Sequence, residues 1–341
     1  MIIARSPLRV TLGGGGTDLP SYYEQHGGFL IAAAIDKYVY ITLHETFVPD
    51  LIVKYSELER VAEASKLKHP IIREAFALVG VGGQSLELTA MADIPAGTGL
   101  GSSGSFTTAL LKALHAHKKN LVHPAELAAQ ACEVEMDRLK EPIGKQDQYI
   151  AAFGGLKCIQ FNPDETVYVD PIICRFETKR RLEESLLLLY TGKTRSADTI
   201  LREQARRTAS DDGTAACARK LSELARDLRR ALCENRSDIV GELMHNAWET
   251  KKQMAPGISS EQIDLWYDRA RAQGAIGGKI LGAGGGGFLL LYAPLIHQER
   301  IIRALPELRR VPFRFEPQGS KIIYVEEPLP DPRPPAADAA I

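Results

Sequence analysis

Hydrophobic positions in the first part of the chain fall in short runs that favour strands. β-Branched, aliphatic and aromatic residues dominate these runs, and glycine or polar residues separate them. The pattern predicts strands at residues 2–5, 9–12, 29–35, 38–44 and 86–92. Residues 69–79, which precede the last of these strands, have a helical pattern instead.

The central part of the chain is mainly helical by the same criterion. We expect helices at residues 105–118, 124–139 and roughly 145–153, and Pro124 suits the first turn of the second one. Two strands follow, at residues 156–161 and 166–169. A break is then expected around residues 171–184, where residues 175–181 are polar and charged.

The last part of the chain mixes both patterns. Helices are expected with little interruption over residues 196–254, and further elements follow: strand 186–190, helix 260–273, strands 278–281 and 288–292, helix 296–305, and strands 311–315 and 321–325. Strands neither alternate strictly with helices nor stand together, so we predict an α+β fold. The expected domains are residues 1–175 and 176–326, with a disordered, proline-rich tail at residues 327–341.

Composition limits the classes of partner. The chain has 341 residues, of which 25% are charged and 45% hydrophobic, with a net charge of −1, so no broad basic field attracts nucleic acid or an anionic membrane. No apolar run is long enough to cross a bilayer, and no signal peptide is visible. Five scattered cysteines without CxxC spacing are typical of reduced thiols in the cytoplasm. We therefore expect a cytoplasmic protein with a small-molecule partner, and leave homo-oligomerisation open.

A glycine- and serine-rich segment at residues 95–105 runs directly into a helical pattern. Bare backbone N–H groups and hydroxyls at a helix N-terminus form a favourable site for phosphate. The segment therefore predicts nucleotide binding by Pro95, Gly97, Gly99, Leu100, Gly101, Ser102, Ser103, Gly104 and Ser105.

Glycine-rich segments of this kind have three other interpretations. A dinucleotide-binding βαβ unit needs a strand with an acidic end after the helix, whereas here a second helix follows. A Walker A loop at Gly192 and Lys193 lacks its partner glycine, because Leu187 occupies that position. An ordinary flexible loop remains open, although Pro95 and the immediate helix favour a fixed cradle.

Glycines are concentrated in three places. Of 29 glycines, 15 fall at residues 13–16, 97–104 and 277–287, which marks sites of tight turns or close approach. Residues 6–18, 95–105 and 279–287 resemble, in order, the three motifs of the GHMP kinases, the superfamily of galactokinase, homoserine kinase and mevalonate kinase. The resemblance covers roughly residues 1–326. It implies an N-terminal domain like domain 2 of ribosomal protein S5, a C-terminal ferredoxin-like domain, and an active site between them.

The details of two segments indicate a branch of this superfamily. Three glycines precede Thr17 and Asp18 where galactokinases have Gly-Glu-His, and residues 141–148 resemble the bacterial heptose 7-phosphate kinases, with fucokinases as the neighbouring branch. The resemblance implies an ATP- and Mg²⁺-dependent enzyme that phosphorylates the anomeric C1 hydroxyl of D-glycero-D-manno-heptose 7-phosphate. The bisphosphate product would serve capsule or lipopolysaccharide synthesis.

Family roles can be transferred to individual residues. Asp147 resembles the base that accepts the hydroxyl proton, with Arg9 as the cation beside it. An N-cap role for Asp147 and a surface position for Arg9 are the structural alternatives. Ser103 and Glu135 resemble the two protein ligands of Mg²⁺. Their alternatives are an N-cap and a solvated helix charge, and Glu133 is the neighbouring acid.

Candidate residues for binding the acceptor sugar come from several segments. Asp18 resembles the family residue that binds substrate hydroxyls, although a turn aspartate explains it too. Thr17, Gln146 and Gln148 are further candidates for hydrogen bonds to a sugar. In the third glycine cluster, Lys279 and residues 282–287 are expected to close over the phosphates or to pack the domains together, with a structural turn as the alternative. Gly284 and Gly285 of this cluster are expected near the substrate.

A cationic loop follows the strand predicted at residues 186–190. Lys193 and Arg195, with three hydroxyls and a helix start, predict a site for the distal phosphate of the acceptor. A polar connection capped by Ser196 explains the same residues. Two other functions stay open at this point: a fucokinase-like or other hexose 1-kinase, and a non-catalytic sugar or nucleotide sensor of the same fold. An NAD(P)-dependent oxidoreductase is disfavoured by the helix after the glycine loop.

Overall fold

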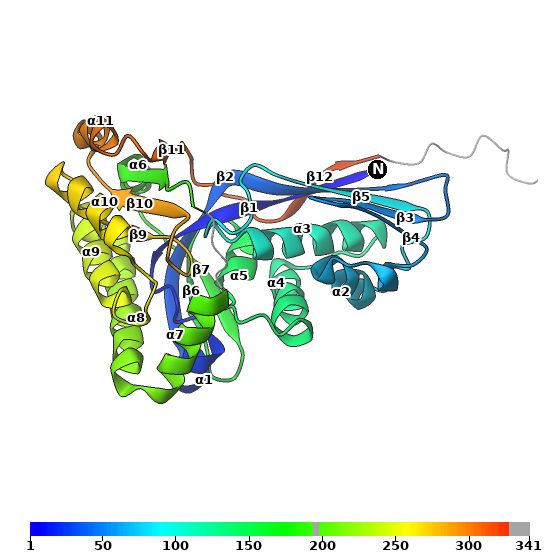
Figure 1. Cartoon of the computed structure of the whole chain (residues 1–341), viewed down its shortest axis with the longest axis horizontal. Coiled ribbons are helices and arrows are strands. Elements are labelled where there is room, and N and C mark those ends of the chain that lie inside the picture. The colour runs from blue at the N-terminus through cyan, green and yellow to red at the C-terminus, as the bar shows by residue number, and fades with distance from the viewer. Residues whose placement is uncertain (194–197, 327–341) are drawn as a thin grey trace, which may run out of the picture.

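A computed structural model describes residues 1–193 and 198–326. Two sheets lie side by side, each covered by helices, and the long axis of the molecule runs from the N-terminal sheet to a helical bundle beside the smaller sheet (Figure 1). The mixed order of elements confirms the predicted α+β class. The expected tail at residues 327–341 lies outside the described residues.

The first sheet has eight strands in the order β12-β1-β2-β5-β3-β4, with β6 beside β2 and β7 beside β6. Their bounds are β1 Ile2–Gly13, β2 Gly28–Glu45, β3 Leu51–Lys54, β4 Leu58–Val61, β5 Leu86–Ala92, β6 Leu156–Phe161, β7 Val167–Pro171 and β12 Lys321–Val325. Strand β1 joins the two short strands expected at residues 2–5 and 9–12. A register shift after Pro7 lets one strand continue across Ser6, Pro7 and Leu8, which separate the two expected strands.

Helices cover one face of this sheet (Figure 1). They are α2 Pro70–Val79, α3 Ser102–His117, α4 Pro124–Cys132 and α5 Gln146–Phe153, while the short α1 Pro20–His26 and the 3-10 turn η1 Ala64–Lys66 lie in the connections. Leu110 and Leu114 of α3 pack with Leu30 and Ile41 of β2 in the core below the sheet. The apolar face of α3 thus fixes its N-terminus against the sheet.

The smaller sheet has the antiparallel order β11-β8-β10-β9. Its strands are β8 Leu186–Tyr190, β9 Gly277–Ile280, β10 Phe288–Tyr292 and β11 Arg309–Arg310. Helices of this part are α6 Phe176–Ser185, α7 Asp198–Ser210, α8 Asp212–Cys233, α9 Val240–Lys251, α10 Glu261–Ala272 and α11 Leu295–Ala304, with the 3-10 turn η3 Ser237–Ile239. The succession β8, helices, β9, β10, α11, β11 is the ferredoxin-like βαββαβ order.

One hydrophobic core joins the two sheets. Leu8 and Leu100 from the first part pack in one cluster with Leu228 of α8 and Leu290 of β10. Strand β12, which comes last among the described elements, pairs with β1 in the first sheet. The expected division at residue 175 stays a prediction, but residues 321–325 lie in the first sheet.

Several expected elements are wrong or were missed. Residues 176–185 form helix α6 instead of a break, because Thr178 and Leu182 make a buried stripe despite the surrounding charges. Residues 311–315 are not a strand, and Phe315 makes only an isolated bridge to Ile35. The pattern also missed α1, β3 and β4, which are short elements with weak periodicity.

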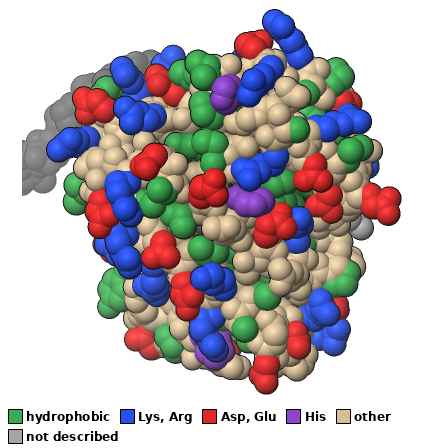
Figure 2. Space-filling model, turned by 90° about the vertical axis from the view of Figure 1, so that its left-hand side faces the viewer, with side chains coloured by type: hydrophobic (Ala, Val, Ile, Leu, Met, Phe, Trp, Pro, Cys, Tyr) green, Lys and Arg blue, Asp and Glu red, His purple; other side chains and the backbone are tan. Residues whose placement is uncertain are grey.

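The surface agrees with the balanced charge of the chain. On the side of the molecule turned toward the viewer in Figure 2, which is the left-hand side of Figure 1, acidic and basic side chains are interspersed rather than segregated. Within the described part of the chain, no helix has the length and apolar character needed to span a bilayer.

Candidate active site

A cleft of about 800 Å³ lies where the three glycine clusters meet. Two of these clusters, residues 97–104 and 277–287, are in direct backbone contact. A Cβ at Gly99 would lie 2.5 Å from the carbonyl oxygen of Leu281, and a Cβ at Gly287 would lie 2.2 Å from that of Thr98. Only glycine permits this approach, so the phosphate-loop segment and the turn between β9 and β10 pack through bare backbone.

The N-terminus of α3 opens into the cleft. Helix α3 begins at Ser102, three residues earlier than expected, and Gly101 caps it with a φ of 78°. Ser103 is therefore inside the first turn, and its interpretation as an N-cap is wrong. The buried hydroxyl of Ser102 lines the cleft and has no hydrogen-bond partner within the described chain. Free backbone N–H groups and this hydroxyl suit an anion.

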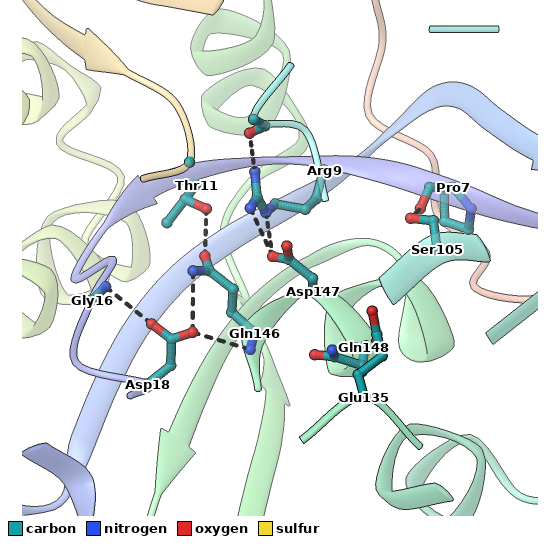
Figure 3. Close-up of polar contacts among 12 residues, drawn as sticks. Pro7, Arg9, Thr11, Gly16, Asp18, Ser105, Glu135, Gln146, Asp147 and Gln148 are labelled. Carbon is teal, nitrogen blue, oxygen red and sulfur yellow. Dashed lines mark hydrogen bonds and ion pairs between the residues drawn. The ribbon is translucent and has the colours of Figure 1, made fainter. Parts of the chain in front are cut away.

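Ser105 has a different role from its neighbours. Its hydroxyl donates to the carbonyl oxygen of Pro7 over 2.7 Å, which fastens α3 to β1. The close-up shows the Ser105 side chain next to Pro7 (Figure 3).

Arg9 and Asp147 form an ion pair beside the helix start (Figure 3). Nε and Nη2 of Arg9 each lie 2.7 Å from Oδ1 of Asp147, and Arg9 also donates to the carbonyl oxygen of Gly99. Arg9 is only 3% exposed, so its interpretation as a surface residue is wrong. Lys145 is the N-cap of α5, which leaves Asp147 in the first turn rather than at the cap.

The environment of Asp147 suits a proton acceptor. Burial raises the pKa of Asp147, and the adjacent Arg9 guanidinium opposes that rise. A carboxylate with increased proton affinity that a cation keeps ionised can accept a hydroxyl proton.

Glu135 is buried at the end of α4. The helix expected over residues 124–139 changes there to a π-helical turn, η2 Glu133–Arg138, a distortion that often accompanies functional sites. Glu135 is 0% exposed and accepts hydrogen bonds from Ser103 and from Gln148, the latter over 2.7 Å. The solvated-charge alternative is therefore wrong for Glu135. It describes Glu133 instead, which pairs with Arg138 at the surface.

The donor set around Glu135 fits a small divalent cation. Burial raises the pKa of Glu135 to about 8, and within residues 1–193 and 198–326 no basic side chain pairs with it. A buried carboxylate without a cation is costly, and a carboxylate plus a hydroxyl at the phosphate loop match the oxygen ligands that Mg²⁺ prefers.

Asp18 is the centre of a hydrogen-bond network on the side of the cleft away from the start of α3. Its carboxylate accepts hydrogen bonds from the backbone N of Gly16 and from both the backbone N and Nε2 of Gln146. Thr11 donates to Oε1 of Gln146 over 2.7 Å, which fixes the orientation of the amide (Figure 3). A Cβ at Gly144 would lie 2.0 Å from Oδ2 of Asp18, so only a glycine fits there.

The side chains of two residues predicted to bind the acceptor sugar are engaged in other contacts. The hydroxyl of Thr17 is buried and bonded to the backbone of Gly14 and Phe29, where it fixes the first glycine loop. Gln148 is fully buried beside Glu135, away from Asp18. Both stay predictions as substrate ligands.

The remaining predicted residues lie at the cleft's edge or beyond it. Gly284 and Gly285 pack on the backbone of Ile258, with a hydrogen bond of 3.0 Å from Gly285 N. Lys193 is exposed and does not line the cleft. Arg195 lies outside the described residues.

Sequence reasoning missed two polar residues of the cleft wall, Lys251 and Gln204. Lys251 continues the buried stripe of α9 that contains Met244 and Trp248, and Gln204 continues the stripe that Ile200 begins on α7. A polar residue at a buried helical position is a signal visible in the sequence.

The cleft extends from this polar region into an apolar pocket. Tyr55, His69 and Phe106 line that pocket, with His69 stacked on Phe106 at 5.2 Å between ring centroids. Val39 and Ile71 complete its wall. A flat heteroaromatic ring beside the phosphate-binding helix start suits this pocket.

Comparison with known proteins agrees with this geometry. The family model described as GHMP kinases N terminal domain matches residues 63–155, and the model described as GHMP kinases C terminal matches residues 228–309.

Individual relatives are also similar over most of the chain. The D-glycero-alpha-D-manno-heptose 7-phosphate kinase of Campylobacter jejuni is 27% identical, with 94% of this chain and 98% of that protein covered. The bifunctional fucokinase/GDP-fucose pyrophosphorylase of Arabidopsis thaliana is 26% identical over 84% of this chain but only 29% of its own length. The solved structure of a D-glycero-D-manno-heptose 1-phosphate kinase from Bacteroides thetaiotaomicron has a TM-score of 0.80 and 26% identity, covering 96% of this chain and 100% of that one.

Proposed function

The chain belongs to the GHMP kinase family, and from this premise we propose that it transfers a phosphoryl group from ATP to the anomeric C1 hydroxyl of D-glycero-D-manno-heptose 7-phosphate. The product would be heptose 1,7-bisphosphate, a precursor of nucleotide-activated heptose for capsule or lipopolysaccharide synthesis. The enzyme class, an ATP-dependent sugar kinase, follows from the family. The acceptor is inferred from the heptose-phosphate kinase relatives.

The observation that carries the proposal is the position of the Arg9–Asp147 pair. It lies between the free N-terminus of α3 and the Asp18 carboxylate. Phosphoryl transfer needs the triphosphate held on one side and an acceptor hydroxyl aimed at it from the other. In this arrangement Asp147 accepts the proton of the acceptor hydroxyl, while Arg9 holds the carboxylate in place and stabilises its charge.

The two sides of the pair bind different groups. Backbone N–H groups at the start of α3 bind the phosphates of ATP, and the apolar pocket around His69 takes the purine. Ser103 and Glu135 would hold Mg²⁺, which neutralises charge on the phosphates when bound. Asp18 and Gln146 orient the sugar through its hydroxyls.

An acceptor screen tests this function. Purified protein with ATP and Mg²⁺ is offered D-glycero-D-manno-heptose 7-phosphate, L-fucose, galactose and mannose, and ADP release is measured. We expect the heptose phosphate to have the highest kcat/KM, and ³¹P NMR to show a second phosphate on C1. Highest activity on fucose would favour the fucokinase-like alternative, and sugar binding without turnover would favour a sensor.

A further inference from the structure

Two lysines from distant segments meet beside Gly15 of the first glycine loop. Lys251 ends α9 and Lys279 lies in β9, and they are 6% and 5% exposed. A Cβ placed on Gly15 would lie 3.5 Å from Nζ of Lys279 and 3.7 Å from Nζ of Lys251. Both ammonium groups therefore border the same glycine.

Neither lysine has a counter-ion in the described part of the chain. Only Lys251 makes a hydrogen bond, from Nζ to the carbonyl oxygen of Gly282 over 3.3 Å. Asp18 is the nearby acid, but Gly16 and Gln146 already occupy its carboxylate. Two buried ammonium groups without an anion are costly, which indicates a site completed by a ligand.

The lowered pKa values of both lysines also indicate a site for an anion. Burial lowers the pKa of Lys251 to about 8, with Asp18 opposing the shift and Arg9 adding to it. Burial also lowers the pKa of Lys279 well below its usual range, and the charges of Lys251 and Arg9 add to that shift. An anion bound between the lysines would favour their charged forms and so raise both pKa values.

A third polar group lies beside the lysines. Gln204 of α7 is 0% exposed and lines the cleft, and a Cβ at Gly16 would lie 2.4 Å from its Nε2. Neither Nε2 nor Oε1 of Gln204 has a partner within residues 1–193 and 198–326. A fully buried amide with both atoms unsatisfied in a cleft wall indicates a polar ligand.

The cluster lies on the acceptor side of the reaction centre. Gly15 contacts Thr11, which bonds to Gln146 and through it to the Asp18 carboxylate. The phosphate-binding start of α3 contacts Asp147 from the other side, where a Cβ at Gly104 would lie 2.8 Å from Cβ of Asp147. Lys251 also donates to the carbonyl oxygen of Gly282, which packs on Gly99 of the phosphate loop. The lysines thus lie where the acceptor side meets the phosphate loop, and the binding experiment below distinguishes the two ligands.

We propose that Lys251 and Lys279, with Gln204, bind the phosphate that the acceptor already carries. This inference rests on the proposed function and deepens it, because it assigns the distal end of the sugar to this cluster. Two ammonium donors match a phosphate dianion, and the Gln204 amide adds a donor for a phosphate or hydroxyl oxygen. The lysines thereby select a phosphorylated sugar over a neutral one.

The test compares Lys251→Met and Lys279→Met with wild-type protein on two acceptors. We expect kcat/KM for D-glycero-D-manno-heptose 7-phosphate to fall by about ten- to hundredfold, the range for one charge-assisted hydrogen bond. On unphosphorylated D-glycero-D-manno-heptose the change should stay below about threefold, because that acceptor lacks the group that the lysines bind. Equal losses on both acceptors, or no loss, would overturn the proposal.

A matched control is the next lysine along the chain. Lys252 pairs with Glu249 and Asp264 at the surface, so Lys252→Met should leave both acceptors unaffected. Thermal unfolding at pH 7 separates function from folding. Because a methionine removes a buried charge, the Lys251→Met protein should unfold at a temperature no lower than wild type.

A binding experiment does not depend on turnover. Inorganic phosphate is titrated by calorimetry into protein saturated with a non-hydrolysable ATP analogue and Mg²⁺, so that the start of α3 is occupied. Phosphate binding that both lysine variants lose supports the proposal, even if wild-type protein does not phosphorylate the heptose, which would refute only the proposed function. Weaker binding of the ATP analogue in the variants, without a separate phosphate site, would assign the lysines to the transferred phosphoryl group instead.

Discussion

The two sides of the Arg9–Asp147 pair use different chemistry to hold negative groups. On the nucleotide side, one continuous segment, residues 95–105, presents neutral backbone N–H groups and hydroxyls at a helix start. On the acceptor side, the structure brings together charged and amide side chains from segments far apart in the sequence, among them Asp18, Gln204 and Lys251. The first arrangement is complete within one loop and helix, whereas the second exists only after folding.

This difference has an energetic origin. Backbone N–H groups at a helix start are unpaired in any helix, so using them for phosphate adds little desolvation cost. Buried ammonium groups lose hydration that nothing replaces until an anion arrives. We therefore expect changes on the acceptor side to affect selectivity and pH dependence, and changes at the centre to affect the rate.

Asp147→Asn removes the proton acceptor between the nucleotide side and the acceptor side, and should have the largest effect on the rate. Without a proton acceptor, kcat should fall by roughly 10²–10⁴-fold, while binding of ATP stays nearly intact. Steady-state kinetics and nucleotide titration measure the two quantities. Asp227→Asn is the control, since Asp227 pairs with Arg230 on the surface of α8. Turnover at the wild-type rate would refute the role of Asp147.

Glu135→Gln tests the nucleotide side alone. Loss of one charged ligand should raise the Mg²⁺ concentration needed for half-maximal rate by about ten- to hundredfold. The KM for the sugar should hardly change, because Glu135 lies away from Asp18. Magnesium titrations of the Glu135→Gln and Glu133→Gln variants show which of the two acids is the Mg²⁺ ligand. If only the Glu133 variant responds, the ligand is assigned to the wrong acid.

The acceptor side should be visible in the pH profile. The pKa of Lys251 is about 8 in the folded protein, below its usual 10.5, so its charge is present below pH 8 and lost above it. For the phosphorylated acceptor, kcat/KM should therefore fall above pH 8 and level off at the ten- to hundredfold loss expected for Lys251→Met.

A conservative variant sharpens this prediction. Lys251→Arg keeps its charge at every accessible pH, so its profile should lose the alkaline limb. Asp18, Arg9 and Lys279 also face this position, and they stay unchanged in the comparison. An identical alkaline limb in the arginine variant would assign the titration to another group.

Lys193→Ala should have the smallest effect. The sequence predicted that Lys193 and Arg195 bind the distal phosphate, and that prediction is untested. Lys193 is exposed, and exposed charges are screened by solvent, so we expect its loss to change the KM for the heptose phosphate by less than about twofold. A large increase in KM would favour the exposed loop over the buried lysines as the phosphate site.

Much of the molecule could be predicted without its structure. Strands β5, β6, β8 and β10 have the predicted bounds, because apolar runs between turn residues define them locally. The start of α3, with its glycines and serines, indicated a phosphate site for the same reason. Helix α6 was missed because charged residues cover its short buried stripe, and the π-helical turn at Glu135 leaves no mark in a helical pattern.

What the sequence alone determined is the set of local features: the strands and helices with strong periodicity, the glycine clusters, and the loop whose own backbone binds phosphate. Only the tertiary structure decided which side chains share the acceptor side. Lys251 and Lys279 stand far apart in sequence, and their meeting at Gly15 depends on how α9, β9 and β1 pack. Local pattern cannot give that result, since the spacing of two charges in space depends on the packing of the whole core.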